Sequence, residues 1–320
     1  MGDKTMQMIS FVIPCYRSME TLPLVIKEID ETMNGSVCKT KYTYEIILVN
    51  DCSPDDTFSV ISKFCETRTD VIGIDFARNF GQHSALMAGL RESHGDIVIC
   101  LDDDGQTPAD EAPKLLQALE DGADVVYARY HQKKHSLFRN FGSYVNEEMA
   151  RFMLDKPKDL YVSSYFAAKR YIVNDMIRYE NSYPYVIGLV LRATKNIVNV
   201  DVKHRSREIG SSGYTLNKLF GLWMNGFTSF SVKPLRIATC MGCIFSILGF
   251  IYGIVVIIQR IVLPDRVLGF ASLMAVLVFF GGMIMIMLGL IGEYVGRIYI
   301  SLNNSPQYVI KEIKRSKEQK

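Results

Sequence analysis

The first 130 residues alternate short apolar runs with segments in which apolar residues recur at helical spacing. Residues 9–14 form an apolar, β-rich run, and Leu22, Val25, Ile26 and Ile29 then follow the 3.6-residue period of a helix over 22–33. The same rules predict further strands over 44–49, 71–76, 97–101 and 125–128. They also predict one helix that begins at Ser53-Pro54-Asp55-Asp56 and two more that cover 84–92 and 110–120. Such alternation is typical of right-handed βαβ units and predicts an α/β domain with a mainly parallel sheet.

Two long apolar stretches without a charged residue lie near the C-terminal end. They cover 237–259 and 267–292, and each is longer than the roughly 20 residues that a bilayer-spanning helix needs. The connection between them is short, which predicts an antiparallel hairpin. We therefore expect four parts: a globular domain over 1–213, an amphipathic juxtamembrane segment over 214–235, two transmembrane helices within 236–297 and a tail over 298–320.

Charge determines the expected orientation in the membrane. Basic residues gather before and after the hairpin, whereas the connecting loop carries only Arg260 and Arg266. The positive-inside rule then places the globular domain and both termini on the cytoplasmic side of the inner (plasma) membrane. The seven cysteines have no disulfide-framework spacing, as in a reducing compartment, and the N-terminus lacks the apolar core of a signal peptide. The net charge of +2 gives no global basic field, so we expect no nucleic-acid partner.

Three consecutive carboxylates, Asp102, Asp103 and Asp104, directly follow the apolar run 97–100. In an extended segment, alternate side chains share a face, so Asp102 and Asp104 would point one way and Asp103 the other. Two such oxygen ligands suit a divalent cation such as Mg²⁺, which takes the rest of its coordination shell from waters and substrate phosphates. The alternative is a solvated acidic loop or a helix N-cap.

Polar side chains also follow the other predicted strands, at 14–17, 50–53, 78–81 and 129. In a parallel sheet, ligands bind beyond the carboxyl ends of the strands, so these residues are expected to share one edge. The GxGxxG fingerprint and a Walker A sequence are both absent, which disfavours a dinucleotide-dependent dehydrogenase and a P-loop NTPase.

These motifs together resemble a known family. The sequences carrying the resemblance are Phe11-Val12-Ile13-Pro14-Cys15-Tyr16, Val49-Asn50-Asp51-Cys52-Ser53, Arg78-Asn79-Phe80-Gly81, Asp102-x-Asp104-x-Gln106 and the paired C-terminal spans. In this order they resemble family 2 glycosyltransferases with a GT-A fold. More narrowly, they resemble the polyisoprenyl-phosphate glycosyltransferases, the group of dolichyl-phosphate mannose synthase and bacterial undecaprenyl-phosphate enzymes. The resemblance covers nearly the whole chain and identifies 1–213 as the catalytic domain.

The resemblance implies a metal-dependent, inverting transfer of one sugar from a nucleotide sugar, of UDP type, to undecaprenyl or another polyprenyl phosphate. It implies a metal site for Mg²⁺ or Mn²⁺ at Asp102, Asp104 and Gln106. It also implies catalytic roles for Asp104, Arg129 and Arg139, of which the two arginines would face the acceptor phosphate. The expected substrate-binding residues are Pro14, Tyr16, Glu20, Asp51, Arg78, Asp103, Arg207 and Ser212.

Two positions depart from the family pattern. Relatives carry an acidic residue where this chain reads Ser163-Ser164-Tyr165-Phe166, so a carboxylate base cannot be transferred to that segment. A family lysine after the Arg-x-x-Gly-x-Ser segment is replaced by Gly213, and Lys218 is a substitute candidate.

Some alternatives stay open. The aromatic segment 214–233, with Trp223 and flanking lysines, suits either an interfacial helix or packing on the globular domain. A processive polysaccharide synthase shares the fold, but its Gln-x-x-Arg-Trp motif is absent. A non-catalytic nucleotide-binding membrane scaffold is the third hypothesis, which the intact carboxylates disfavour. The expected partners are the nucleotide sugar, the polyprenyl phosphate and the lipid bilayer, and a homo-oligomer is compatible with them.

Overall fold

The structure is a computed structural model that describes residues 6–130, 151, 156–203, 233–262, 270–303 and 305–316. The chain divides into two compact units. One contains residues 1–219 together with 304–320, and the other contains residues 220–303.

The described residues of the first unit form an eight-stranded mixed sheet with the strand order β7-β5-β6-β4-β1-β2-β3-β8. Its strands are β1 (Gln7–Cys15), β2 (Tyr42–Asn50), β3 (Val71–Phe76), β4 (Ile97–Cys100), β5 (Val125–Tyr130), β6 (Phe166–Lys169), β7 (Ile197–Val202) and β8 (Ile310–Lys314). Strand β1 pairs in parallel with β2 and β4, β2 with β3, and β5 with β7. Strand β6 runs antiparallel to both β4 and β5, and β8 runs antiparallel to β3.

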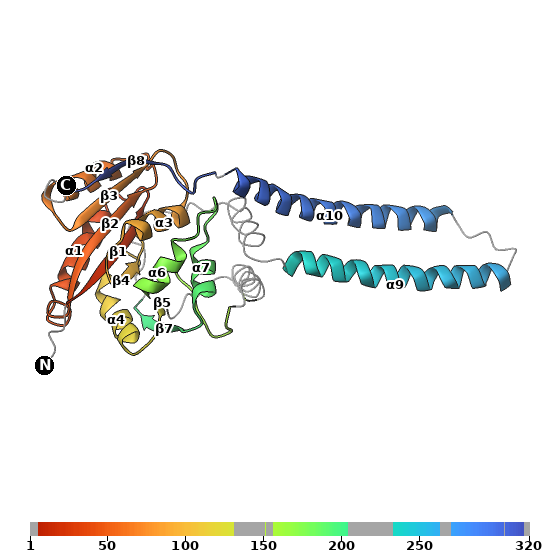
Figure 1. Cartoon of the computed structure of the whole chain (residues 1–320), viewed down its shortest axis with the longest axis horizontal. Coiled ribbons are helices and arrows are strands. Elements are labelled where there is room, and N and C mark those ends of the chain that lie inside the picture. The colour runs from red at the N-terminus through yellow and green to blue at the C-terminus, as the bar shows by residue number, and fades with distance from the viewer. Residues whose placement is uncertain are drawn as a thin grey trace. The chain divides into compact units, whose positions relative to one another are not determined.

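Helices cover both faces of this sheet (Figure 1). Their bounds are α1 (Leu22–Met33), α2 (Thr57–Thr67), α3 (Gln82–Glu92), η1 (Ala109–Glu111), α4 (Ala112–Glu120), α6 (Arg170–Met176) and α7 (Val186–Ala193). Helices α1, α2 and α4 pack on one face and α3, α6 and α7 on the other. Because both faces are covered, the inner strands are buried continuously rather than at alternate residues, as in β1, which is buried from Ile9 to Cys15.

The order of the strands reverses at β1. The chain runs outward from β1 to β2 and β3, then returns to the other side of β1 as β4. In sheets of this kind the crevice at the reversal point, beyond the carboxyl ends of the strands, is where ligands bind. Residues 16–20, after β1, and 101–106, after β4, lie at this point.

The sequence pattern located most elements of the first 130 residues. The predicted helix over 22–33 and the predicted strand over 71–76 have the same bounds in the structure. The helix expected to begin at Ser53 was placed too early, because it begins at Thr57. The Asp55 carboxylate accepts hydrogen bonds from the Thr57 hydroxyl at 2.6 Å and from the Thr57 N–H at 3.3 Å, so residues 53–56 form a turn ahead of the helix.

The segment expected as a C-terminal tail contains strand β8. Residues 310–314 pair with the outer edge of β3, and the Val309 carbonyl accepts a hydrogen bond from the Ala77 N–H next to that strand. Tyr308 stacks on Phe76 with ring centroids 5.1 Å apart. Gln307 donates hydrogen bonds from its Nε2 to the carbonyl oxygens of Tyr179 and Asn181 at 2.7 and 2.9 Å. The last strand is therefore part of the same unit as the strands that precede the apolar hairpin.

In the second unit the structure describes two long helices, α9 (Lys233–Val262) and α10 (Phe270–Leu302). Within the described residues, the segments Leu235–Val255 and Val276–Ile300 are long and apolar enough to cross a membrane, with mean hydropathies of 2.0 and 2.2. The two helices touch through Phe245, whose ring lies 6.0 Å from that of Phe279 and 6.2 Å from that of Phe280. The expected pair of apolar helices is confirmed.

Candidate active site

Asp102 lies just beyond β4 and is held by side chains from two other elements. Its Oδ1 accepts a 2.8 Å hydrogen bond from Nε2 of Gln82, the first residue of α3, and its Oδ2 accepts one from the Ser164 hydroxyl. Burial is the main reason why the pKa of Asp102 is raised to about 6. The hydrogen bond from Ser164 opposes this rise, and the negative charges of Asp104 and Asp103 add to it. The carboxylates thus lie close enough to repel one another.

Asp103 connects the end of β4 to the end of β1. Its Oδ2 accepts a 2.9 Å hydrogen bond from the backbone N–H of Tyr16. Burial raises the pKa of Asp103, although hydrogen bonds from Ser18 and Tyr16 oppose this. Asp102 and Asp103 therefore bond to different elements, as expected, but not because the segment is extended. Strand β4 ends at Cys100, and residues 103–105 form a bend with Gly105 at φ 72°.

Asp104 and Gln106 form the outer part of this loop. The Asp104 Oδ1 accepts a 3.0 Å hydrogen bond from the Gln106 N–H, and both residues are half-buried. In the described part of the chain, no group of three or more His, Cys, Asp or Glu side chains is arranged to hold a metal. The donor set nevertheless suits Mg²⁺ or Mn²⁺, because such ions bind proteins through one or two carboxylates and complete their shell with water and phosphate oxygens. Burial is the main cause of the raised pKa of Asp102, and a cation would offset both this burial and the repulsion from Asp104 and Asp103.

Asp51, at the end of β2, is buried and anchors the start of α3. Its two carboxylate oxygens accept hydrogen bonds from the N–H groups of Phe80 and Gly81 at 2.6 and 2.8 Å. Burial raises the pKa of Asp51, and these two hydrogen bonds oppose the rise. Gly81 has φ 89°, a conformation that favours glycine, and Gln82 follows it directly. Asp51 therefore positions the turn that directs Gln82 to Asp102.

The other residues expected to bind substrate occupy the same strand ends. Pro14 is buried in β1 opposite Val49, whereas Tyr16 and Glu20 are exposed between β1 and α1. Arg78 is exposed after β3, with its guanidinium 4.6 Å from the centroid of the Phe80 ring.

Arg129 lies in β5 and is bound to uncharged oxygens. Its Nη2 donates to the carbonyl oxygen of Asp159 at 3.0 Å and to Oδ1 of Asn199 at 2.9 Å. The next residue, Tyr130, faces the carboxylates. Burial raises the pKa of its hydroxyl, and the charges of Asp102, Tyr161 and Asp104 raise it further. The remaining expected residues, Arg139, Arg207 and Ser212, lie outside the described residues, as do Gly213, Lys218 and most of the segment 214–233.

Gln82, Ser164 and Tyr130 contact or face the carboxylates and were not predicted from the sequence, and neither was Ser18 beside Asp103. Ser164 belongs to the segment that departs from the family pattern, but nothing in its local spacing connects it to Asp102. The β4–β6 pairing makes that connection. It places Cys100 opposite Phe166, and the same register continued by two residues places Ser164 opposite Asp102.

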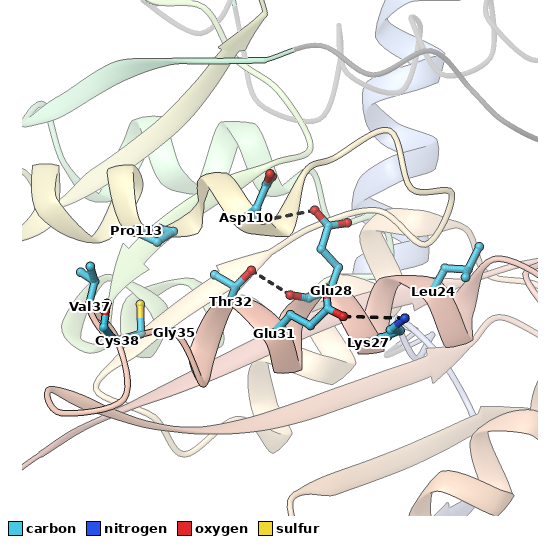
Figure 2. Close-up of a pocket in the computed structure, with 11 residues that line it drawn as sticks. Leu24, Lys27, Glu28, Glu31, Thr32, Gly35, Val37, Cys38, Asp110 and Pro113 are labelled. Carbon is cyan, nitrogen blue, oxygen red and sulfur yellow. Dashed lines mark hydrogen bonds and ion pairs between the residues drawn. The ribbon is translucent and has the colours of Figure 1, made fainter.

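A pocket of about 570 Å³ lies elsewhere, between α1 and the η1–α4 segment (Figure 2). Its polar groups are paired with one another: Glu28 accepts a hydrogen bond from the Asp110 N–H at 3.3 Å, and Lys27 lies 3.7 Å from Glu31. None of the expected site residues lines it. The candidate active site is therefore the group of strand ends around Asp102.

Two family models match this chain. The model of glycosyl transferase family 2 matches residues 10–177, and that of the GtrB C-terminal hairpin matches residues 233–298. The first match contains the carboxylates and the strand ends described above, and the second covers α9 and most of α10.

Solved structures show the same fold. Glucosyl-3-phosphoglycerate synthase from Mycobacterium tuberculosis, in complex with phosphoglyceric acid, superposes with a TM-score of 0.51 over 68% of this chain and 76% of that chain, at 19% identity. The same synthase in complex with Mn²⁺ and uridine-diphosphate-glucose gives a TM-score of 0.50, with the same coverage and identity. At this identity the similarity concerns the GT-A-like fold alone.

Curated relatives are similar along the whole chain. The undecaprenyl-phosphate 4-deoxy-4-formamido-L-arabinose transferase of Photorhabdus laumondii is 32% identical over 98% of this chain and 96% of its own. The transferase of that name from Yersinia enterocolitica is 33% identical over 95% of this chain and 93% of its own. The chain therefore belongs to glycosyl transferase family 2 and is a glycosyltransferase with a C-terminal hairpin of the GtrB type.

Proposed function

We propose that this protein transfers one sugar from a nucleotide sugar to undecaprenyl phosphate or another polyprenyl phosphate, in a metal-dependent reaction at the cytoplasmic face of the inner membrane. The observation that carries the proposal is the carboxylate cluster 102–104 at the strand-order reversal of a family 2 domain followed by two apolar helices. The names of the relatives support a polyprenyl-phosphate acceptor.

On the donor side, Asp102 and Asp104, with Gln106, would hold Mg²⁺ or Mn²⁺ against the diphosphate. When bound, such an ion stabilises the negative charge that develops on the leaving diphosphate. Tyr16 and Glu20, beside Pro14, would line the nucleotide pocket. Asp51 would accept hydrogen bonds from the base or ribose. Each carboxylate oxygen can accept more than one hydrogen bond, so both oxygens keep a lone pair in addition to the one that accepts from a backbone N–H group.

Arg78 and Asp103 would also help to bind the nucleotide sugar. Arg78 is exposed beside the loop that Asp51 anchors, and Asp103 fixes the backbone of Tyr16 at the other side of the crevice. Arg207 and Ser212 would close over the pyrophosphate, as the family motif implies.

On the acceptor side, the lipid phosphate is already an anion at neutral pH and needs no general base. The hydroxyl-bearing Ser163-Ser164 segment is compatible with this chemistry. Arg129 would contact the phosphate with guanidinium N–H groups other than the Nη2 group bound to Asp159 and Asn199, and Arg139 would join it. A direct in-line displacement by the phosphate oxygen would invert the anomeric carbon.

The names of the relatives also guide the choice of donor. A UDP-linked donor is the first choice, and the relatives' names make 4-deoxy-4-formamido-L-arabinose the first sugar to test. The apolar hairpin would keep the enzyme in the bilayer, where the prenyl chain of the acceptor lies.

The test is a donor screen with the purified full-length protein in lipid nanodiscs that contain undecaprenyl phosphate. Radiolabelled UDP- and GDP-sugars are supplied singly with Mn²⁺, and organic-phase extraction followed by mass spectrometry identifies the product. We expect one donor to give a lipid carrying a single sugar. A polymer in the product, or no transfer from any donor by a protein that binds nucleotide, would contradict the proposal.

A further inference from the structure

Each oxygen of the Asp102 carboxylate accepts a hydrogen bond from a neutral side chain. Ser164 donates its hydroxyl to Oδ2, and Gln82 donates Nε2 to Oδ1 at 2.8 Å. A third contact fixes the main chain, because the Thr107 hydroxyl donates to the Asp102 carbonyl and accepts from the Asp102 N–H, with both distances 3.2 Å. The rotation of the Asp102 side chain is therefore determined by its neighbours.

The two donors come from the segment just before β6 and from the start of α3. Ser164 lies two residues before β6, where continuing the β4–β6 register beyond the Phe166–Cys100 pair sets it opposite Asp102. Gln82 is the first residue of α3, whose preceding turn is anchored by the two hydrogen bonds to Asp51. A hydrogen bond from a fixed element orients a carboxylate more strongly than one from a mobile side chain.

The neighbouring serine shows that this contact is specific to one position. The hydroxyl of Ser163 donates to main-chain oxygens, those of Ala128 at 2.9 Å and Tyr165 at 2.8 Å. Two adjacent, half-buried serines thus have different partners, one the backbone and the other a carboxylate.

We propose that Ser164 and Gln82 are positioning residues that hold Asp102 in the orientation required for a divalent cation. This inference rests on the proposed metal-dependent function. Both oxygens of Asp102 keep lone pairs for a metal while they accept these hydrogen bonds. Groups that hydrogen-bond a metal ligand typically change metal affinity by about 10–100-fold when they are removed.

Binding of Mn²⁺ to the full-length protein tests this inference. The free Mn²⁺ signal in electron paramagnetic resonance is titrated with protein in the presence of UDP and, in parallel, of GDP. We expect Ser164→Ala to raise the Kd for Mn²⁺ by about 10–100-fold. Ser164→Thr keeps the hydroxyl and should stay close to the wild type, and Ser163→Ala is the matched control that should bind Mn²⁺ normally.

Gln82→Met provides an independent variant, because Gln82 is exposed and its loss should not unfold the chain. It should also weaken Mn²⁺ binding, and the double variant with Ser164→Ala should depart from additivity, because the two side chains act on one carboxylate. In transfer assays we expect the Mn²⁺ concentration for half-maximal rate to rise, with much of the rate recovered at saturating Mn²⁺.

Two negative results have different meanings. If the wild type binds Mn²⁺ while Ser164→Ala and Gln82→Met bind it equally well, the positioning roles are wrong and the proposed function stands. If the folded wild type binds no Mn²⁺ with either nucleotide, the metal dependence in the proposed function fails and the inference fails with it.

Discussion

Lys311 Nζ, in the last strand of the chain, lies 3.1 Å from Oδ2 of Asp75, a carboxylate that is only 5% exposed. The other Asp75 oxygen accepts a 2.7 Å hydrogen bond from Nδ2 of Asn50, the residue directly before Asp51. Strand β8 is therefore connected through two buried side chains to the end of β2, where the nucleotide is proposed to bind.

This connection predicts unequal effects of two substitutions. Asp75→Ala leaves the buried Asn50 amide without its acceptor, which we expect to cost about 1–3 kcal/mol of the free energy of unfolding. Lys311→Met should destabilise the protein less, because an ion pair with an exposed ammonium group contributes little to the free energy of unfolding. Thermal unfolding of both variants in the same detergent measures the difference. An equal or larger loss for Lys311→Met would contradict this ranking.

Strand β8 also predicts the topology. Residues 310–314 share a sheet with strands that precede the hairpin, so the chain enters and leaves α9 and α10 on the same side of the membrane if both helices span it. We expect tags at both termini of the chain to be reached by protease only after the inner membrane is permeabilised. A tag cleaved from the periplasmic side while the other is protected would overturn this arrangement.

Helix α3 packs so closely on the sheet that a methyl group at Gly89 has no room. A Cβ there would lie 2.4 Å from Cγ1 of Val12 and 3.3 Å from Cγ2 of Val49. We expect Gly89→Ala to destabilise the protein by about 1–3 kcal/mol through overpacking. Adding Val12→Ala removes the closest atom, so the double variant should lose less stability than the sum of the two single variants. Strict additivity in thermal unfolding would show that the contact is not the cause.

His83 predicts a pH dependence of stability. Its Nδ1 is buried without a hydrogen-bond partner among the described residues, its ring packs 5.1 Å from that of Tyr185, and burial lowers its pKa from 6.5 to about 4. Above pH 6.5 the ring is neutral in both the folded and unfolded states. As the pH falls from 6.5 toward 4, the unfolded state takes up the proton first, so folding loses stability in this window.

The variant His83→Phe keeps an aromatic ring and removes the proton site. We expect its Tm to fall less between pH 6.5 and 4 than that of the wild type. A His83→Phe slope equal to that of the wild type would show that His83 does not carry the effect.

The sequence predicted the fold where the signal was local. The apolar period of residues 22–33 and the apolar run 71–76 each determine an element by themselves, and both bounds were confirmed. Strand β8 was missed because Ile310-Lys311-Glu312-Ile313-Lys314 has few apolar residues, and only its pairing with β3 makes it a strand. The start of α2 was placed too early because Asp55 bonds to Thr57 rather than lying inside the helix.

The candidate site divides in the same way. Asp102, Asp103 and Asp104 can be recognised from the sequence because they are adjacent acids after an apolar run. Their partners cannot be recognised in this way, because Gln82 lies 20 residues and Ser164 62 residues from Asp102 in the chain. Only the strand register and the packing of α3 bring these side chains together, and neither can be deduced from local spacing.

The carboxylates after β4 are proposed to support metal-dependent transfer of one sugar to a polyprenyl phosphate. Asp104→Asn keeps the side-chain oxygen that accepts the Gln106 N–H but removes the charge proposed to hold the cation. Asp103→Asn is the matched neighbour, because Asp103 bonds to the Tyr16 backbone rather than lying in the proposed metal site.

The most direct measurement is the rate of formation of the lipid-linked sugar as a function of Mn²⁺ concentration, for the wild type and these two variants in nanodiscs. We expect the wild-type rate to vanish in EDTA and to return with Mn²⁺ or Mg²⁺. Asp104→Asn should be slower by at least about 100-fold, since losing several kcal/mol of charge stabilisation has this effect, whereas Asp103→Asn should be milder. Transfer that persists in EDTA, or equal losses in the two folded variants, would contradict the account.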